Sequence, residues 1–193
     1  MRGIEQIPWM YDALLWFSEH TGFGPWRRWL PAGARGRTLD LGTGTGRNLP
    51  LLPGAARAVG VDPYVWNLRR ARRRAPGVPL VQARAEALPF RDGAFDTVLS
   101  GLVMCSVDEP PQAFAEVRRV LRPGGVLRML EHVRGEGRQG RFQDWVQPAW
   151  TAVAGGCRPN RDTEGEVGRA GFEVEAGSRR ARGVMRRLVA WRR

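Results

Sequence analysis

The sequence contains no lysine. All 31 basic residues are arginines, against 19 acidic residues, so guanidinium groups alone carry the net charge of +12. This absence excludes a P-loop nucleotide site, because its GxxxxGK[ST] motif requires a lysine. The charge nevertheless predicts attraction to acidic partners, including a peripheral contact with an acidic membrane surface. The run RRARRR at 69–74 covers every face of its predicted helix and lacks interleaved aromatic residues, so we interpret it as a solvated surface rather than a nucleic-acid site.

Cysteine is scarce as well. Cys105 and Cys157 lie far apart and belong to no CxxC or Cys/His ligand spacing, so neither a zinc motif nor a disulfide framework is indicated, and we expect no metal and a reducing, cytoplasmic setting. Long hydrophobic runs are also missing. The apolar segment IPWMYDALLWF near the N-terminus contains Asp12 and is too short and too polar to cross a bilayer, and we expect no secretory signal.

What the chain does contain, from residue 37 onward, is an alternation of short apolar runs with helical stretches, which is typical of parallel βαβ units. The predicted strands cover 37–41, 57–61, 78–81, 95–100 and 126–131. The predicted helices cover 63–75 and 110–121, both with proline near the start, and 139–154, broken at Pro148. The tail from AGFEVEAG to VMRRLVAW predicts a final hairpin of two strands. We therefore expect an α/β fold: a Rossmann-like, seven-stranded, mostly parallel sheet with an antiparallel last strand and helices on both faces.

The N-terminal segment has a different character. Residues 4–30 show helical spacing of aromatic residues, interrupted by TGFGP, and we interpret this segment as a helical lid. The chain is then one domain in three parts: a lid at 1–35, a cofactor-binding core at 36–131, and substrate-side helices with a C-terminal hairpin at 132–193.

A glycine-rich turn follows the first predicted strand. Residues 42–46 read GTGTG behind Asp40, which is not the GxGxxG of a dinucleotide fold. The missing side chains let a ligand approach the backbone at the carboxyl end of the strand, where open parallel sheets bind their ligands. Asp62 ends the second strand, and its carboxylate can accept both hydroxyls of a ribose. These features predict a ligand of the adenosine type.

The series LDLGTGTG, VGVDP, AEALPF, FDTVLSGLVMCSV and RVLRPGG resembles, in order and spacing, the motifs of class I S-adenosylmethionine-dependent methyltransferases. Further along, LEHV, QDWVQPAW, GGCRPNRDT and AGF resemble a narrower group, the thiol methyltransferase-like proteins related to the human alkyl-thiol enzymes. The resemblance implies S-adenosylmethionine as cofactor and S-adenosylhomocysteine as product. It implies cofactor contacts from Asp40, Gly42, Thr43, Gly44, Gly46, Asn48, Asp62, Pro63, Ala85, Glu86 and Ser100.

Two positions depart from the patterns of these groups. Arg84 stands where similar methyltransferases place an aspartate on the adenine amino group, and a guanidinium cannot accept that hydrogen bond, so the adenine contact must come from the backbone, from Glu86 or from elsewhere. Arg158 follows Cys157 where similar sequences have histidine.

Two residues are candidates for catalysis. His132 directly follows the fifth predicted strand, where it could take a proton or orient a substrate, or merely end the strand. Either Arg161 or His132 could be a cation that stabilises a thiolate. We expect Cys157 to be structural, because methyl transfer from a sulfonium needs no covalent enzyme intermediate, and we place Cys105 in the core. Trp145 and Trp150 could wall an apolar substrate cavity or simply pack.

The sequence thus predicts a methyltransferase that acts on a small molecule, with a thiol as the expected acceptor. The alternatives are methylation of a quinone precursor or of a phospholipid head group. A nucleic-acid-directed methyltransferase or an RNA-binding protein is a further alternative, motivated only by the charge, and we do not expect nucleic acid as the partner.

Overall fold

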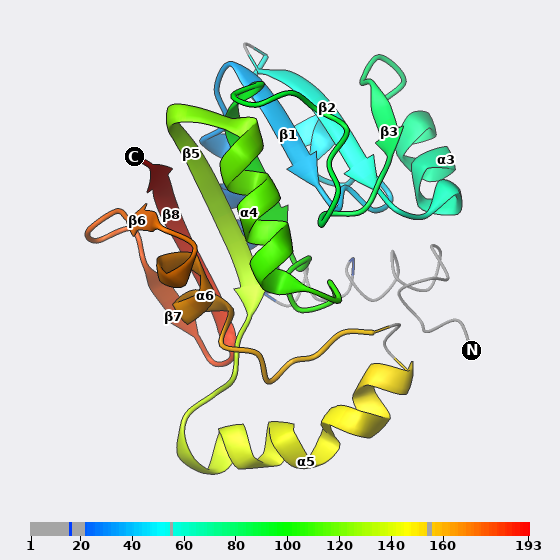
Figure 1. The fold of residues 1–193 in the computed structure, drawn as a ribbon. Coiled ribbons are helices and arrows are strands. Elements are labelled where there is room, and N and C mark those ends of the chain that lie inside the picture. The colour runs from blue at the N-terminus through cyan, green and yellow to red at the C-terminus, as the bar shows by residue number, and fades with distance from the viewer. Residues whose placement is uncertain (1–15, 17–21, 55, 154–155) are drawn as a thin grey trace.

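The computed structural model describes residues 16, 22–54, 56–153 and 156–193. Its centre is an eight-stranded sheet in the order β3-β2-β1-β4-β5-β8-β6, with β7 paired to β8 (Figure 1). Strands β1 to β5 pair in parallel, and β6, β7 and β5 each pair antiparallel with β8. The elements are α2 (Gly24–Ala32), β1 (Arg37–Leu41), η3 (Leu49–Leu51), β2 (Arg57–Asp62), α3 (Val65–Arg74), β3 (Leu80–Gln82), β4 (Phe95–Gly101), α4 (Pro110–Val120), β5 (Leu121–His132), α5 (Gly137–Val153), α6 (Thr163–Arg169), β6 (Phe172–Val174), β7 (Arg180–Arg182) and β8 (Met185–Arg192).

The central strands are buried on both faces, which explains why their sequences are nearly continuous apolar runs. Successive side chains of β4 point to opposite faces. Val98 packs in the cluster that includes Phe114 of α4, whereas Leu99 packs in a second cluster with Leu30 of α2. All four side chains are at most 1% exposed, so helices cover the middle of the sheet from both sides, as the sequence pattern predicts.

Arg119 fixes α4 to the segment that precedes β4. Its Nε and Nη2 donate to the two oxygens of Glu116 at 2.7 and 2.9 Å, and Nη1 donates to Asp92 Oδ1 at 2.8 Å. Two further bonds reach the carbonyl oxygens of Phe90, at 2.7 Å, and Leu88, at 2.9 Å. The planar fork of the guanidinium therefore satisfies several acceptors of an irregular loop at once.

Two predicted boundaries were wrong. β5 begins at Leu121 rather than at residue 126, because Leu121 already pairs with Phe95 before a register shift lets the strand continue past the RPGG stretch. α5 is not broken at Pro148 but runs through it, and its ribbon bends along its length in Figure 1. Proline removes the helical donor to the carbonyl of Asp144, and Asp144 is exposed, so water can satisfy that carbonyl.

The C-terminal region forms three short antiparallel strands rather than a two-stranded hairpin. β6 and β8 correspond to the two predicted strands, and β7 is an additional strand that pairs with β8 through Arg182 and Met185. The sheet consequently has eight strands instead of the expected seven, while its mostly parallel character and antiparallel end are as predicted.

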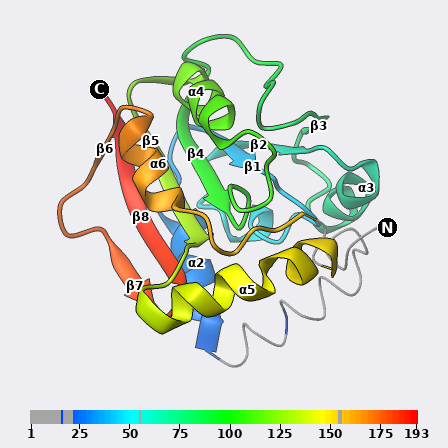
Figure 2. The ribbon, with the colours of Figure 1, turned by 60° about the horizontal axis from the view of Figure 1, so that its bottom comes forward.

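The predicted lid lies largely outside the described residues. Its described part, α2, is packed against the sheet (Figure 2): Arg128 of β5 donates from Nε to the carbonyl of Leu30 at 2.9 Å and from Nη2 to that of Trp29 at 2.6 Å. The guanidinium also lies 4.2 Å from the centroid of the Trp29 ring. Within the described part of the chain, no helix combines the length and apolar character that a bilayer crossing requires.

Candidate functional site

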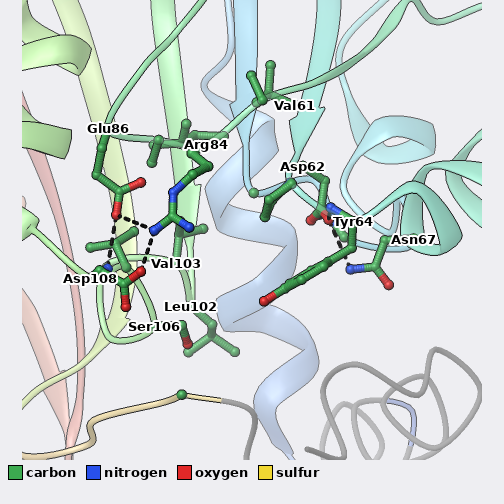
Figure 3. A pocket seen from close by; sticks show the side chains of 18 of the residues that line it. Val61, Asp62, Tyr64, Asn67, Arg84, Glu86, Leu102, Val103, Ser106 and Asp108 are labelled. Atoms are coloured by element: carbon green, nitrogen blue, oxygen red, sulfur yellow. Dashed lines mark hydrogen bonds and ion pairs between the residues drawn. The ribbon is translucent and has the colours of Figure 1, made fainter. Parts of the chain in front are cut away.

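A cavity of about 420 Å³ opens at the carboxyl ends of β1, β2 and β4. The strands that follow β1 in sequence, β2 and β3, lie on one side of it, and β4 and β5 lie on the other. The strand order therefore switches between β1 and β4, and such a switch point is where open α/β sheets bind ligands. Figure 3 shows polar side chains on opposite sides of the cavity, with Asp62, Tyr64 and Asn67 on one side and Arg84, Glu86 and Asp108 on the other. The cavity is lined by Leu41, Gly42, Gly44, Val61, Asp62, Pro63, Tyr64, Asn67, Ala83, Arg84, Ala85, Glu86, Gly101, Leu102, Val103, Ser106, Val107, Asp108 and Gly156.

The three glycines of the turn have left-handed backbone angles, with φ of 57° at Gly42, 56° at Gly44 and 78° at Gly46. A Cβ on Gly42 would lie 2.5 Å from Val103 Cγ2, and one on Gly46 would lie 2.8 Å from the Cα of Ala71 in α3. A Cβ on Gly44 would meet nothing nearer than the carbonyl oxygen of Gly42 at 3.9 Å. Gly42 and Gly46 are therefore required by packing, whereas Gly44 leaves open space on the cavity side.

Asp40 supports this turn from inside the protein. Its carboxylate is fully buried and accepts hydrogen bonds from Thr43 Oγ1 at 2.6 Å and from Asn48 Nδ2 at 2.8 Å. Burial raises the pKa of Asp40, and the two hydrogen bonds oppose that rise. Asp40, Thr43 and Asn48 are absent from the cavity wall, and so is Gly46. In the structure these four predicted site residues shape the loop that Gly42 and Gly44 present to the cavity.

Asp62 connects the glycine turn to α3. Its Oδ2 accepts from the backbone N–H of Gly44 at 3.0 Å, and Oδ1 accepts from the N–H of Tyr64 at 2.9 Å and from Asn67 Nδ2 at 3.1 Å. Burial raises the pKa of Asp62, and these hydrogen bonds lower it. A carboxylate has about four acceptor positions, and three are used within the protein, so the geometry leaves about one for a ligand hydroxyl rather than two.

The opposite side of the cavity carries an ion-pair group. Arg84 pairs with the carboxylate of Asp108 and lies 3.5 Å from Glu86 Oε1 (Figure 3). Glu86 Oε1 also accepts from the backbone N–H of Asp108 at 2.9 Å. The Asp108 hydrogen bond is the main cause of the raised pKa of Arg84. Predicted residues Pro63, Ala85 and Glu86 do line the cavity, but the side chain of Glu86 is occupied in holding the loop before α4.

Glu131, which sequence reasoning did not select, organises the turn after β4. Its buried Oε1 accepts from Ser100 Oγ at 2.7 Å and from the backbone N–H groups of Val103 at 3.0 Å and Met104 at 3.3 Å. Burial raises its pKa. In this turn Leu102 has a φ of 61°, a left-handed angle that is strained for a residue with a bulky side chain. Ser100, a predicted cofactor contact, thus serves the Glu131 network and does not reach the cavity wall. The sequence signal that could have identified Glu131 is an acidic residue inside an otherwise apolar strand.

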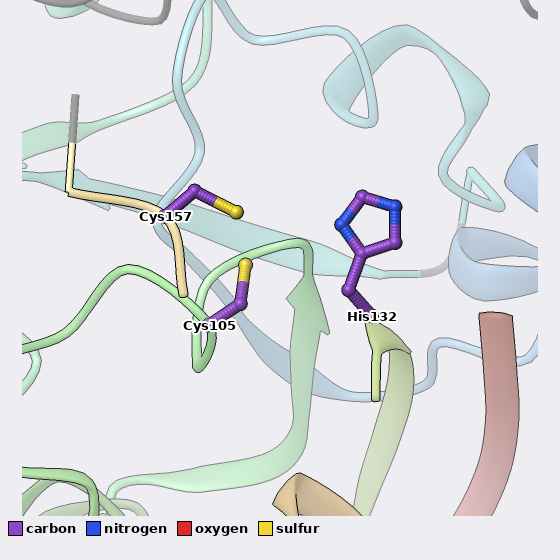
Figure 4. A group of neighbouring side chains, drawn as sticks. All are labelled: Cys105, His132 and Cys157. Carbon is purple, nitrogen blue, oxygen red and sulfur yellow. The ribbon is translucent and has the colours of Figure 1, made fainter. Parts of the chain in front are cut away.

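The two predicted catalytic residues lie beside two cysteines. The side chains of Cys105, His132 and Cys157 approach one another, with every pair of potential ligand atoms within 4.8 Å (Figure 4). Arg161 donates from Nη1 to the carbonyl of Met104 at 2.7 Å. Burial and then the charge of Arg158 lower the pKa of Arg161, while the two cysteines and Asp108 act in the opposite direction, which places its charge near both thiols.

The two thiols interact with each other. The Cys105 hydrogen bond, aided by His132 and Trp150, lowers the pKa of Cys157 to about 4, and the same bond raises the pKa of Cys105. Trp150 therefore contacts this group, whereas Trp145 is 78% exposed and packs against Phe142 with ring centroids 6.1 Å apart. The chain neighbours of the cysteines, Ser106 and Gly156, line the cavity, so the group adjoins it.

Comparison with known proteins identifies similar methyltransferases. Residues 39–129 match the methyltransferase domain family. The human thiol S-methyltransferase TMT1B is 35% identical over 151 residues, which cover 72% of this chain and 62% of that protein. A demethylmenaquinone methyltransferase of Renibacterium salmoninarum is 36% identical over 96 residues, covering 49% of this chain and 40% of that protein. The chain spans between 59% and 62% of the length of the thiol S-methyltransferases that it matches.

A solved structure from Thermotoga maritima supports the fold. It is described as an S-adenosylmethionine-dependent methyltransferase, possibly a histamine N-methyltransferase, and aligns with a TM-score of 0.72 at 23% identity over 98% of both chains. By its domain match, its relatives and this fold, the chain belongs to the class I S-adenosylmethionine-dependent methyltransferases.

Proposed function

We propose that this protein transfers the methyl group of S-adenosylmethionine to the sulfur of a small, apolar thiol. The observation that carries the proposal is the position of two cationic or basic side chains, Arg161 and His132, in the group that adjoins the cavity. The relative named a thiol S-methyltransferase supports it, because the 151 aligned residues extend beyond the domain match at 39–129.

The cavity fits the cofactor of this family. Its volume of about 420 Å³ lies in the range of about 300 to 1,000 Å³ that small-ligand sites occupy. Gly44 leaves its space free, Asp62 has an acceptor position for a ribose hydroxyl, and the ring of Tyr64 lies on the wall. Asp108, held by Arg84, offers a carboxylate for the adenine amino group in place of the acid that the sequence lacks at position 84. When bound, S-adenosylmethionine supplies a methyl group on a sulfonium, from which a neutral thioether leaves readily.

For the acceptor, the protein then needs mainly to keep the sulfur of the substrate ionised as a thiolate. A free thiol with a pKa of about 8.5 is only partly ionised at neutral pH, and a neighbouring cation increases the thiolate fraction. The guanidinium of Arg161 is half-buried, so solvent screens its field less than that of an exposed arginine. Arg161 raises the thiolate fraction, and Leu102 and Val103 contribute apolar side chains to the wall of the cavity.

The test is an assay for S-adenosylhomocysteine across a panel of alkyl thiols, quinols, amines, phospholipid head groups and RNA. We expect turnover with small alkyl thiols and background rates with the other acceptors. The Asp62→Asn variant serves as the control for cofactor-dependent turnover. Turnover of a quinol with inert thiols would establish the alternative that the demethylmenaquinone methyltransferase relative represents, and turnover of RNA alone would establish a nucleic-acid substrate.

A further inference from the structure

Cys105, His132 and Cys157 come from three separate segments and meet at one point. Cys105 lies in the turn after β4, His132 ends β5, and Cys157 follows α5 in the loop before α6. Both cysteines are buried, at 2% and 5% exposure, and neither is in a disulfide. Figure 4 shows the two sulfurs and one edge of the imidazole directed into a common space.

The chain holds these segments together by other contacts. The backbone N–H of Arg158 donates to the carbonyl of Cys105 at 2.7 Å, which joins the two cysteine loops. The buried amide of Gln143 donates to the carbonyls of Val133 at 3.1 Å and Pro159 at 2.9 Å. Gln143 Oε1 also accepts from the N–H of Gly135 at 2.6 Å. The loops that carry His132 and Cys157 are thus tied to one side chain of α5.

The polar atoms of the cluster interact mainly with one another. His132 hydrogen-bonds to the thiol of Cys157, which shares a further hydrogen bond with Cys105. Among the described residues, the buried Nδ1 of His132 has no nitrogen or oxygen partner. Two thiols and an imidazole nitrogen are the ligand types that soft divalent metals prefer.

We propose that Cys105, His132 and Cys157 bind one zinc ion whose fourth coordination position opens toward the cofactor cavity. Zinc–sulfur bonds of about 2.3 Å and zinc–nitrogen bonds of about 2.0 to 2.1 Å separate tetrahedral ligands by roughly 3.4 to 3.8 Å. The ligand atoms here lie within 4.8 Å of one another, so closure on the ion requires movements of about an ångström or less, which rotations of the side chains can supply. Three protein ligands with one open position are typical of catalytic rather than structural zinc.

The charge of the site indicates what the open position takes. Two thiolates neutralise the charge of Zn²⁺, and the nearby guanidinium groups of Arg161 and Arg158 favour an anion beside them. The thiolate of the acceptor is such an anion; this part of the inference rests on the proposed function. The thiol releases its proton to solvent on binding. Its sulfur then forms the bond to the methyl carbon as the carbon–sulfonium bond breaks, and that electron pair stays on the departing sulfur. Zinc keeps its oxidation state, and the neutral thioether binds weakly and leaves.

The first experiment measures metal binding without cofactor or acceptor. The reduced, metal-free protein is titrated with Zn²⁺ against a chromophoric chelator, and with Co²⁺ by absorption spectroscopy. We expect one equivalent of either ion and a sulfur-to-cobalt charge-transfer band whose intensity indicates two thiolates. Cys105→Ser, Cys157→Ser and His132→Gln should each weaken binding at least about 10-fold. Ser178→Ala is the control, because Ser178, in the loop between β6 and β7, makes its hydrogen bonds to the backbone of Glu175 and Val189 and none to the three ligands.

A second measurement avoids dependence on folded variants. In the native wild-type protein, Zn²⁺ should protect both cysteines from alkylation under reducing conditions. Addition of propane-1-thiol to the cobalt-loaded protein should intensify the charge-transfer band. The zinc site is overturned if the wild type binds Zn²⁺ no more tightly than the Cys105→Ser/Cys157→Ser double variant. It is also overturned if the reduced protein has no metal affinity and its two cysteines instead form a disulfide in air. An unchanged cobalt spectrum with propane-1-thiol overturns the substrate position. Absence of thiol methylation by a zinc-binding protein contradicts the proposed function alone.

Discussion

Gly44 and Gly183 form a matched pair for testing whether the glycine turn contacts the cofactor. Both have a φ of 56°, and a Cβ on Gly183, in the turn between β7 and β8, would meet no atom within 4 Å. An alanine at either position should cost about 1 to 2 kcal/mol of stability, because the left-handed conformation brings Cβ close to the backbone. The φ angle that causes this cost is the same at the two positions, and of the two glycines only Gly44 lines the cavity.

The effect on binding should separate the two variants. The N–H of Gly44 is held by Asp62 Oδ2 at 3.0 Å, so the turn cannot retreat from a ligand without losing that bond. A methyl group forced between the turn and the ligand is an overpacking change that costs about 1 to 3 kcal/mol, which weakens binding by about 5- to 160-fold. Gly44→Ala should lose affinity for S-adenosylhomocysteine in this range, and Gly183→Ala should bind like the wild type.

Calorimetric titration with S-adenosylhomocysteine measures the affinities, and denaturant unfolding measures the shared loss of stability. Wild-type affinity in Gly44→Ala would refute the reasoning, because it would show that the turn needs glycine only for its backbone angle. Equal losses of affinity in both variants would also refute it, since strain far from the cavity would then control binding.

Three further predictions concern charged groups of the site. In Asp62→Asn the side chain can accept hydrogen bonds with one oxygen only. Affinity for S-adenosylhomocysteine should therefore fall by about 13- to 160-fold, which corresponds to a charged hydrogen bond of about 1.5 to 3 kcal/mol. An unchanged affinity in calorimetry would refute the contact between Asp62 and the ribose. Arg161→Ala should lower thiol turnover chiefly below the thiol pKa of about 8.5, with a deficit that shrinks in alkali, and a pH-independent deficit would exclude thiolate stabilisation. Because burial raises the pKa of Glu131, the wild type loses stability relative to Glu131→Gln as the pH rises through that pKa. Urea unfolding should show the difference growing as the pH rises above the ordinary glutamate pKa of about 4.5, and a constant difference would contradict this prediction.

Local sequence signals were sufficient for much of the sheet. β1 occupies the predicted residues 37–41, and α4 begins at Pro110, because an apolar run and a proline at a first helical position act over a few residues. The start of β5 could not be predicted, since Leu121 joins the strand only through its pairing with Phe95. The glycines were identified by pattern, but only the structure separates Gly44, with its open space, from those that packing requires.

The cysteine cluster lay beyond sequence reasoning for a related reason. Metal-site motifs are recognised by short spacings, and Cys105, His132 and Cys157 come from segments that only the folded sheet and the loop after α5 bring together. The isolation of the two cysteines in sequence led to the expectation of no metal, and Cys157 was expected to be structural because methyl transfer needs no covalent enzyme intermediate. His132 and Arg161 were predicted because they follow the fifth strand and belong to the acceptor-side motifs, and the structure brings both of them to the thiols.

The five hydrogen bonds of Arg119 also bear on the tolerance of this lysine-free chain to mutation. A lysine at this position would offer a single nitrogen, which cannot reach both oxygens of Glu116 and the loop carbonyls together. Arg128, which joins two carbonyls of α2 and covers an aromatic ring, is equally resistant to exchange. Exposed arginines of α3, such as Arg72 and Arg73, face no comparable demand. The arginines of this chain are therefore of two kinds. At some positions the shape of the guanidinium is indispensable, and at others only the positive charge matters. Substitution by lysine should be tolerated only at the second kind of position.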